Sequence, residues 1–228
     1  MLSDEEKYKE MKGAGVYLDY AATTPTDEAV FDVMKPYFSE KYGNASSVHQ
    51  FGQESAVAVV HARHQVAEFL NCQPSEIIFT SGATEGNNTI IKGIGGRRSL
   101  AKKIGGQAQL DQGHAERGGK AHIIISAIEH ECVRASAEFV AKEEIAEITF
   151  LPVNKDGLVE ISELEKSIKP NTVLVSIMYA NNEVGTIQPV AQISELLKRI
   201  NQNRENKIAI HTDAVQAINY LDCDEKKL

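Results

Sequence analysis

The stretch "KIAIHTDAVQ", residues 207–216, is the one on which the predicted fold rests. An apolar run passes directly into His211, Thr212 and Asp213, which is the pattern of a short buried strand with a carboxylate at its tip. A carboxylate in such a place is costly unless a positive group meets it. Asp213 therefore indicates a cationic partner at this end of the strand.

Other short apolar runs alternate with helical patterns along the chain. The predicted strands cover residues 76–80, 122–126, 148–153, 173–178 and 207–212. The predicted helices cover residues 53–70, 131–142, 161–168 and 190–201. The near-continuous apolar character of the strands favours burial on both faces. This alternation predicts an α/β fold in which helices flank a largely parallel sheet.

The length of the chain suits one globular domain, or one large domain with a fragment of a second. Residues 95–119 are rich in glycine, mildly basic and without a sustained apolar face. We expect this stretch to be a surface excursion between a helix and the next predicted strand. It is either a flexible loop or a loop that docks a partner.

The composition argues against several classes of function. A net charge of -8 over 228 residues gives no support to a nucleic-acid partner. No apolar run approaches the roughly 18 residues of a membrane span, and the charged N-terminus lacks the apolar region of a secretory signal. The three cysteines are too scattered for a disulfide framework. We therefore expect a cytoplasmic protein without a membrane partner, and the sequence predicts no metal site.

The stretch "IIFTSGATEGNNTIIKGI", residues 77–94, places small residues between a predicted strand and a helix. Free backbone N–H groups and the positive end of the helix dipole would face a ligand there. The hydroxyl groups of Ser81 and Thr84 can add hydrogen bonds. This arrangement is typical of a phosphate site, although an ordinary N-cap by Ser81 or Thr84 would leave the same pattern.

Side chains of other chemistry follow two later strands. Glu129 and His130 come after the second predicted strand, at the edge where open α/β sheets bind ligands. A histidine there is either structural or able to stack on a flat ring and exchange protons near neutral pH. Asn181 and Asn182 follow the fourth strand, and we expect one of them to form the turn while the other points into the cleft.

The predicted strand ends thus supply a phosphate cradle, an imidazole, an amide and a carboxylate. A single flat, phosphorylated, cationic heterocycle would satisfy all of these groups, and pyridoxal 5′-phosphate is such a molecule. Its protonated ring nitrogen requires a buried carboxylate partner. A charge-assisted hydrogen bond to Asp213 would keep the ring an effective electron sink.

Six stretches also occur in the order in which a known family has them. They are "VYLDYAATTP" (16–25), "YGNASSVHQFG" (42–52), "FTSGATEGNN" (79–88), "EHECV" (129–133), "VSIMYANNEVGTIQP" (175–189) and "HTDAVQ" (211–216). The chain thereby resembles the cysteine desulfurases, in the class V branch of fold-type-I pyridoxal-phosphate enzymes. The resemblance implies an N-terminal segment, residues 1–25, followed by part of the family's cofactor-binding large domain, residues 26–228, which would be incomplete at its C-terminus. It implies that residues 95–119 are an insertion in this domain. It also implies that Ala83 and Thr84 contact the cofactor phosphate, and that His130 stacks on the ring and acts in proton transfer.

The same resemblance implies roles at the other strand ends. Asp213 would pair with the ring nitrogen, Gln216 would reach the phenolic oxygen, and Asn182 would approach that oxygen or the substrate. The family moves the sulfur of L-cysteine onto an enzyme cysteine as a persulfide and releases alanine. The sulfur then serves iron–sulfur cluster assembly and thio-modification. The expected partners are a second copy in a homodimer of the full-length protein and an iron–sulfur scaffold or sulfur-acceptor protein.

The sequence departs from the family pattern in its catalytic parts as well as in the insertion. In the family, the lysine that binds the cofactor lies in a Ser-x-His-Lys motif shortly after "HTDAVQ", and the persulfide cysteine lies in a later domain. Lys226 and Lys227 lack the surrounding motif. Cys132 is either a nucleophile or a small packing residue. We therefore expect the N-terminal portion of a longer enzyme, without the C-terminal small domain and inactive alone.

Two kinds of alternative stay open. The chain could belong to another class V enzyme, such as a selenocysteine lyase, an aminotransferase or a kynureninase-like hydrolase. It could also be a non-catalytic remnant that keeps only a dimerisation or binding surface. Only sulfur transfer needs the persulfide cysteine, so that residue would discriminate among the enzymes.

Overall fold

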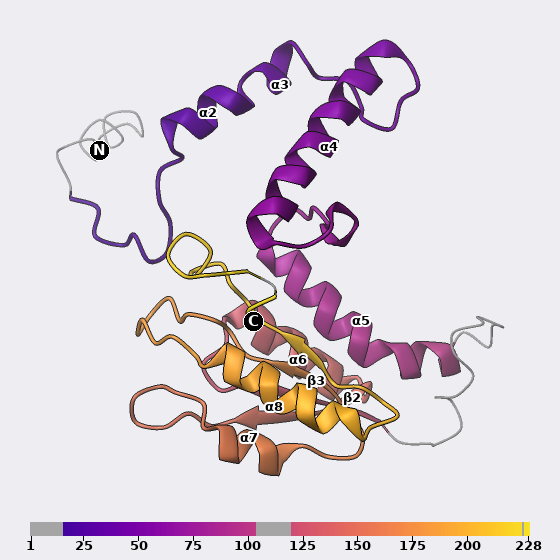
Figure 1. Cartoon of the computed structure of the whole chain (residues 1–228), viewed down its shortest axis with the longest axis vertical. Coiled ribbons are helices and arrows are strands. Elements are labelled where there is room, and N and C mark those ends of the chain that lie inside the picture. Colours follow the sequence, from indigo (N-terminus) through magenta and orange to yellow (C-terminus); the bar gives the residue numbers. More distant parts are fainter. Residues whose placement is uncertain (1–15, 104–119, 225) are drawn as a thin grey trace, which may run out of the picture. The chain divides into compact units, whose positions relative to one another are not determined.

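The structure is a computed structural model, and it describes residues 16–103, 120–224 and 226–228. The chain divides into two compact units, Met1–Ala58 and Val59–Leu228. Figure 1 traces both units and the elements in them. The predicted boundary after residue 25 stays a prediction.

The first unit contains helices but little buried surface. It holds α2 (Glu28–Met34), α3 (Pro36–Ser39) and the first part of α4 (Gln50–Leu70). Its large apolar side chains are exposed, with Leu18 and Val48 among the most exposed. Neither hydrophobic cluster of the described residues draws a buried member from this unit. The stability of the described chain therefore depends on the second unit.

The second unit is a parallel sheet with helices on both faces (Figure 1). The strands are β1 (Ala121–Ser126), β2 (Ala146–Leu151), β3 (Thr172–Ser176) and β4 (Ala209–His211), in the spatial order β2-β1-β3-β4. All three strand pairs are parallel. The helices are α5 (Ala83–Lys103), α6 (Glu131–Lys142), α7 (Ile161–Ser167) and α8 (Val190–Gln202). The predicted α/β fold with a largely parallel sheet is confirmed.

Side chains of β1 alternate between two hydrophobic clusters. Ile124 packs into a cluster with residues of α7 and α8. Ile123 and Ile125 pack into a second cluster with residues of α5 and α6. Successive side chains of a strand point to opposite faces, so the sheet is covered on both sides. This explains why its strands read as near-continuous apolar runs.

One fully buried polar side chain joins three strands of the sheet. The Nδ1 atom of His122 on β1 lies 2.8 Å from Thr172 Oγ1 on β3, and its Nε2 atom lies 2.8 Å from Thr149 Oγ1 on β2. Burial, with a smaller effect of Lys169, lowers the pKa of His122 to about 4. The imidazole is therefore neutral at neutral pH, and both of its nitrogen atoms are satisfied.

Two predicted elements are wrong in part. The predicted strand 76–80 is a 3₁₀ turn, Pro74–Glu76, followed by extended chain in which Ile78 is 82% exposed. Extended chain becomes a strand only where a neighbouring strand takes its hydrogen bonds, and none of the described strands pairs with this segment. Residues 95–103 continue helix α5, since residues with good helix propensity follow the two glycines. Residues 104–119 of the predicted insertion lie outside the described residues.

Candidate cofactor site

Asp213 lies directly after β4, where its side chain is 9% exposed. Its Oδ2 atom accepts a hydrogen bond of 2.8 Å from the side-chain amide of Asn87, and its Oδ1 atom accepts one of 3.1 Å from the N–H of Val215. Both donors are neutral, and no ion pair to Asp213 occurs within the described residues. The carboxylate is therefore buried with neutral donors only among the described residues, an environment that a cationic ligand would complement.

Asn87 brings the start of helix α5 to Asp213. This asparagine is 4% exposed and lies in the second turn of α5. Ala83 and Thr84 form the first turn of the same helix and are exposed. The first N–H groups of a helix have no partner within it, so the predicted phosphate donors lie on the element that carries the Asp213 contact. Asn87 is not among the residues predicted from the sequence, because the residues around it give no sign of its contact with Asp213, 126 positions away.

Glu85 occupies part of the same helix start. Its Oε2 atom accepts the N–H of Ser81 at 2.6 Å, and this hydrogen bond lowers the pKa of Glu85. The N–H group of Ser81 is therefore engaged by Glu85, and those of Glu85 and Gly86 donate to the Gly82 carbonyl. The N–H groups of Ala83 and Thr84 have no described partner. A phosphate at this turn would be held by the amide groups of Ala83 and Thr84 and by the Thr84 hydroxyl.

Glu129 is a second buried carboxyl group close to Asp213. Its Oε1 atom accepts hydrogen bonds from Ser126 Oγ at 2.5 Å and from the Met178 N–H at 2.7 Å. Its Oε2 atom is buried without a partner among the described residues. Burial raises the pKa of Glu129 to about 7, and the charge of Asp213 adds to this effect against the two hydrogen bonds. Glu129 therefore holds a proton near neutral pH far more often than an exposed glutamate does.

His130 caps helix α6 and keeps one nitrogen free. Its side chain is exposed, and its Nδ1 atom accepts the N–H of Cys132 at 3.2 Å. The Sγ atom of Cys132 lies 3.0 Å from the same Nδ1 atom. Nε2 makes no hydrogen bond within the described part of the chain. The ring is thus held at Nδ1, while Nε2 and the exposed ring are available to a ligand.

The two adjacent asparagines have different roles. Asn181 is buried, donates from Nδ2 to the Ile128 carbonyl at 3.0 Å, and accepts the N–H groups of Glu183 and Val184 at Oδ1, both at 2.9 Å. It is therefore the turn-forming residue. Asn182 is half-buried, and its side chain makes no hydrogen bond to the described residues.

The described contacts bring together only part of the predicted set. Asp213 and His130 are joined through Asn87 and Cys132. Ala83 and Thr84 share a helix with Asn87. The side chains of Asn182 and Gln216 are not tied to this cluster by any described hydrogen bond, and Gln216 is exposed in the turn after Asp213. The cofactor-binding roles stay predictions for the six residues named in the sequence analysis, which are Ala83, Thr84, His130, Asn182, Asp213 and Gln216.

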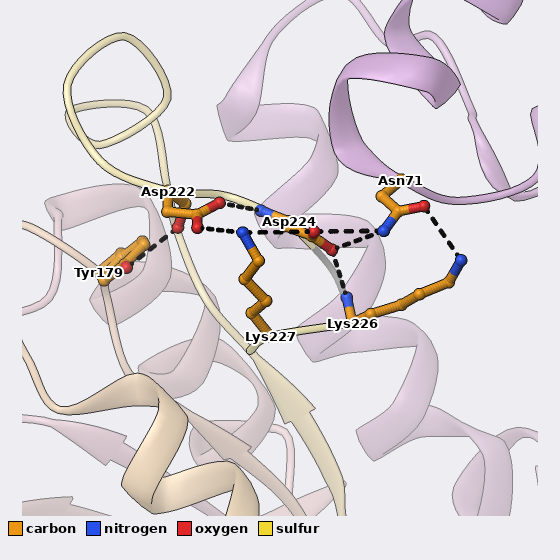
Figure 2. A network of polar contacts seen from close by, with 6 residues as sticks. All are labelled: Asn71, Tyr179, Asp222, Asp224, Lys226 and Lys227. Atoms are coloured by element: carbon orange, nitrogen blue, oxygen red, sulfur yellow. Dashed lines mark hydrogen bonds and ion pairs between the residues drawn. The ribbon is translucent and has the colours of Figure 1, made fainter.

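Lys226 and Lys227 belong to a surface network and not to this cluster (Figure 2). Lys226 Nζ donates to Asn71 Oδ1 at 3.0 Å, while Lys227 Nζ lies 2.7 Å from Asp222 Oδ2 and 3.7 Å from Asp224 Oδ2. Asn71 also donates to the Asp224 carboxylate at 3.1 Å. The Lys226 ammonium group is thus engaged by Asn71, which follows α4, and the Lys227 ammonium group by carboxylates of the terminal segment itself.

Two kinds of feature are absent from the described ranges. There, no helix has both the length and the apolar character that a membrane crossing needs. Nor does any group of at least three His, Cys, Asp or Glu side chains in those ranges have the geometry to hold a metal ion. Cys72, Cys132 and Cys223 are all free thiols.

The residues present fit pyridoxal 5′-phosphate. The Asp213 carboxylate has no cationic partner among the described residues, which suits a protonated pyridine nitrogen. The exposed start of α5 suits a phosphate, and the exposed ring of His130 suits a stacked heterocycle. Asp213 and His130 follow the carboxyl ends of β4 and β1, where open α/β sheets bind ligands, and α5 is tied to this edge by the contact of Asn87 with Asp213.

Comparison with known proteins places the chain in a family. The model of the family "Aminotransferase class-V" matches residues 16–228. The chain is 42% identical over 206 residues to the cysteine desulfurase IscS of Dictyoglomus turgidum, covering 90% of this chain and 46% of that protein. It is 41% identical over 225 residues to the mitochondrial cysteine desulfurase of Saccharomyces cerevisiae, covering 97% of this chain and 40% of that protein. A solved structure named "SspA in complex with cysteine" matches with a TM-score of 0.76 at 36% identity, covering 92% of this chain and 54% of that one.

The parallel sheet flanked by helices defines the class of fold as that of the fold-type-I pyridoxal-phosphate enzymes. Within that class, the chain belongs to the aminotransferase class-V family, and the curated relatives that it matches are cysteine desulfurases. The chain spans about half the length of the curated relatives it matches.

Proposed function

We propose that the protein containing this chain is a pyridoxal-phosphate-dependent cysteine desulfurase. It moves sulfur from L-cysteine onto an enzyme cysteine as a persulfide and releases alanine. The similarity to two cysteine desulfurases at 42% and 41% identity supports this activity. The name of the solved relative, which is in complex with cysteine, supports the substrate class.

The observation that carries the proposal is the state of Asp213. It is buried at the end of β4 and is bonded only to neutral donors within the described residues. When bound, pyridoxal phosphate supplies an electron sink for a carbanion at the substrate carbon. Asp213 contributes by holding a proton on the ring nitrogen, because a charge-assisted hydrogen bond favours the protonated ring.

The other predicted residues divide binding and proton transfer among them. Ala83 and Thr84 hold the phosphate at the start of α5, where the helix dipole favours an anion. His130 covers the ring and moves protons at its open Nε2 atom. Gln216 reaches the phenolic oxygen, and Asn182 approaches the same oxygen or the substrate.

The proposed partners follow from the same family membership. They are L-cysteine, a second copy of the complete protein, and an iron–sulfur scaffold or sulfur-acceptor protein. We propose a cytoplasmic location, which the free thiols Cys72, Cys132 and Cys223 support. One of the relatives is a mitochondrial protein, so a mitochondrial location is the alternative that localisation of the complete protein would reveal.

A product assay on the complete protein tests the activity. The enzyme is incubated with pyridoxal phosphate and L-cysteine, and sulfide and alanine are measured against free cofactor. The expected result is equal formation of both products when a reductant cleaves the persulfide. Turnover of L-selenocysteine but not L-cysteine would indicate a selenocysteine lyase, and exchange of amino groups without sulfide would indicate an aminotransferase. Either result would contradict the proposed activity.

A further inference from the structure

Asn87 connects two residues that lie far from it in the sequence. Its Nδ2 atom is 2.8 Å from Asp213 Oδ2 and 3.2 Å from Cys132 Sγ. A side-chain amide carries two N–H groups, so it can donate to both acceptors at once. Asn87 is 4% exposed, so water does not compete freely for these hydrogen bonds.

Cys132 continues the connection to His130. Because Cys132 Sγ accepts from Asn87, its own S–H is free to donate to His130 Nδ1 at 3.0 Å. The backbone N–H of Cys132 donates to the same nitrogen at 3.2 Å. Donors and acceptors therefore alternate without conflict from Asp213 through Asn87 and Cys132 to His130.

This pattern determines where the neutral imidazole carries its proton. A nitrogen that accepts from a backbone N–H cannot itself be protonated, so the proton of the neutral ring lies on Nε2. Nε2 is also the nitrogen without a described partner. His130 thus presents an N–H donor to whatever ligand it faces. To accept a proton at Nε2, the neutral ring would first have to carry its proton on Nδ1. That would break the hydrogen bond from the Cys132 backbone N–H and reverse the direction of the contact with Cys132 Sγ.

We propose that Asn87 and Cys132 are positioning residues that couple His130 to Asp213. They hold His130 in the tautomer with the proton on Nε2, and Asn87 holds the orientation of the Asp213 carboxylate. The functional meaning of this coupling rests on the proposed roles of Asp213 and His130 in cofactor binding. The tautomer itself does not, because it is a property of the protein without cofactor.

Nitrogen NMR on the protein with ¹⁵N-labelled histidine rings tests the coupling without cofactor. The signals of His130 are assigned with a His130→Gln variant. In the unmodified protein we expect one nitrogen of His130 to show the shift of a protonated atom and the other that of an unprotonated atom. In Cys132→Ala, the ratio of the two tautomers should fall about fivefold, the size expected for loss of one hydrogen bond. In Asn87→Ala the ratio should fall less, because the Cys132 side chain stays but is no longer held by the Asn87 amide.

Conservative and distant variants separate positioning from general loss of structure. Cys132→Ser keeps a donor and an acceptor at the same place and should restore the tautomer ratio. Cys72→Ser changes another free thiol and should leave it unchanged. Circular dichroism identifies any variant that does not fold. If an alanine variant is unfolded, the tautomer ratio of Cys132→Ser is compared with that of the parent instead. An unchanged tautomer ratio in both alanine variants, or a serine variant that behaves like alanine, would overturn the proposal.

A second measurement distinguishes failure of this proposal from failure of the proposed function. Binding of pyridoxal phosphate is titrated to the same set of variants. If the tautomer ratio responds as expected but no variant or parent binds the cofactor, the coupling stands and the cofactor site is wrong. If the cofactor binds but the tautomer ratio does not respond, the cofactor site stands and the coupling is wrong.

Discussion

Glu129 Oε1 lies 2.5 Å from Ser126 Oγ, at the point where β1 ends. The same carboxyl group leaves Oε2 buried without a described partner. A carboxyl group so placed is more easily tolerated when it is neutral. This relationship has a measurable consequence for stability.

We expect Glu129 to destabilise the fold as the pH rises. The pKa of Glu129 in the folded protein, about 7, lies above the ordinary value of 4.5. The stability that Glu129 contributes to the fold is therefore fully present below pH 4.5 and is lost as the pH rises through about 7. Between these limits the loss is roughly 2–4 kcal/mol. Glu129→Gln removes this dependence. The free energy of unfolding, measured with urea from pH 5 to pH 8, should therefore rise in the variant relative to the parent as the pH increases. Glu143→Gln, at an exposed position, is the control; a parallel pair of curves for Glu129→Gln and the parent would refute the expectation.

His122 should act in the opposite direction on the acid side. Its folded pKa of about 4 lies below the ordinary value of 6.5, so the unfolded chain binds a proton first and stability falls as the pH drops from about 6.5 to about 4. His122→Gln should flatten this part of the stability curve. The exposed His61→Gln should leave it unchanged. An unfolding free energy whose acid slope is the same in His122→Gln and in the parent would count against the buried neutral histidine.

Thr84→Ala should weaken binding of the cofactor phosphate. The hydroxyl of Thr84 lies in the exposed first turn of α5, and losing one hydrogen bond to a charged group costs about 1–2 kcal/mol. Titration of pyridoxal phosphate measures the change. Thr89→Ala is the matched control, because Thr89 lies on the same helix and its hydroxyl donates to the Glu85 carbonyl at 2.8 Å. Equal losses in both variants would mean that Thr84 has no special contact with the phosphate.

Asp213→Asn should impair turnover more than cofactor retention in the complete enzyme. An amide cannot keep the ring nitrogen protonated, so stabilisation of the carbanion is lost while the phosphate contacts remain. The exposed Asp156→Asn serves as the control. Turnover is measured as alanine released from L-cysteine, and near-normal turnover of Asp213→Asn would show that Asp213 is not the partner of the ring nitrogen.

Much of the sheet could be predicted because its signals are local. Helix α6, Glu131–Lys142, has the predicted bounds, since a capping residue, His130, directly precedes it, and an apolar face and a basic last turn lie within it. The strand predicted at 76–80 failed because strand formation depends on a partner elsewhere in the chain. Its apolar residues gave the same local signal as β1, and the missing neighbour could not be read from them.

A residue of the candidate site could be predicted only where a polar or ionisable side chain follows the sequence pattern of a strand. Asp213 and His130 do so, because each lies within a few residues of the end of an apolar run. Asn87 and Cys132 do not, since the contact between them joins residues 45 positions apart and that of Asn87 with Asp213 joins residues 126 positions apart. Such contacts arise from the order of the strands and the packing of α5 against α6, which no single stretch encodes.

The central claim is that Asp213 holds the proton of the cofactor's ring nitrogen, and one spectrum tests it most directly. Pyridoxal phosphate labelled with ¹⁵N in its ring is bound to the protein and to Asp213→Asn, and the nitrogen shift reports whether the ring is protonated. We predict a protonated ring nitrogen in the parent and an unprotonated one in bound Asp213→Asn. The same nitrogen shift in both proteins, with the cofactor bound in each, would contradict the claim.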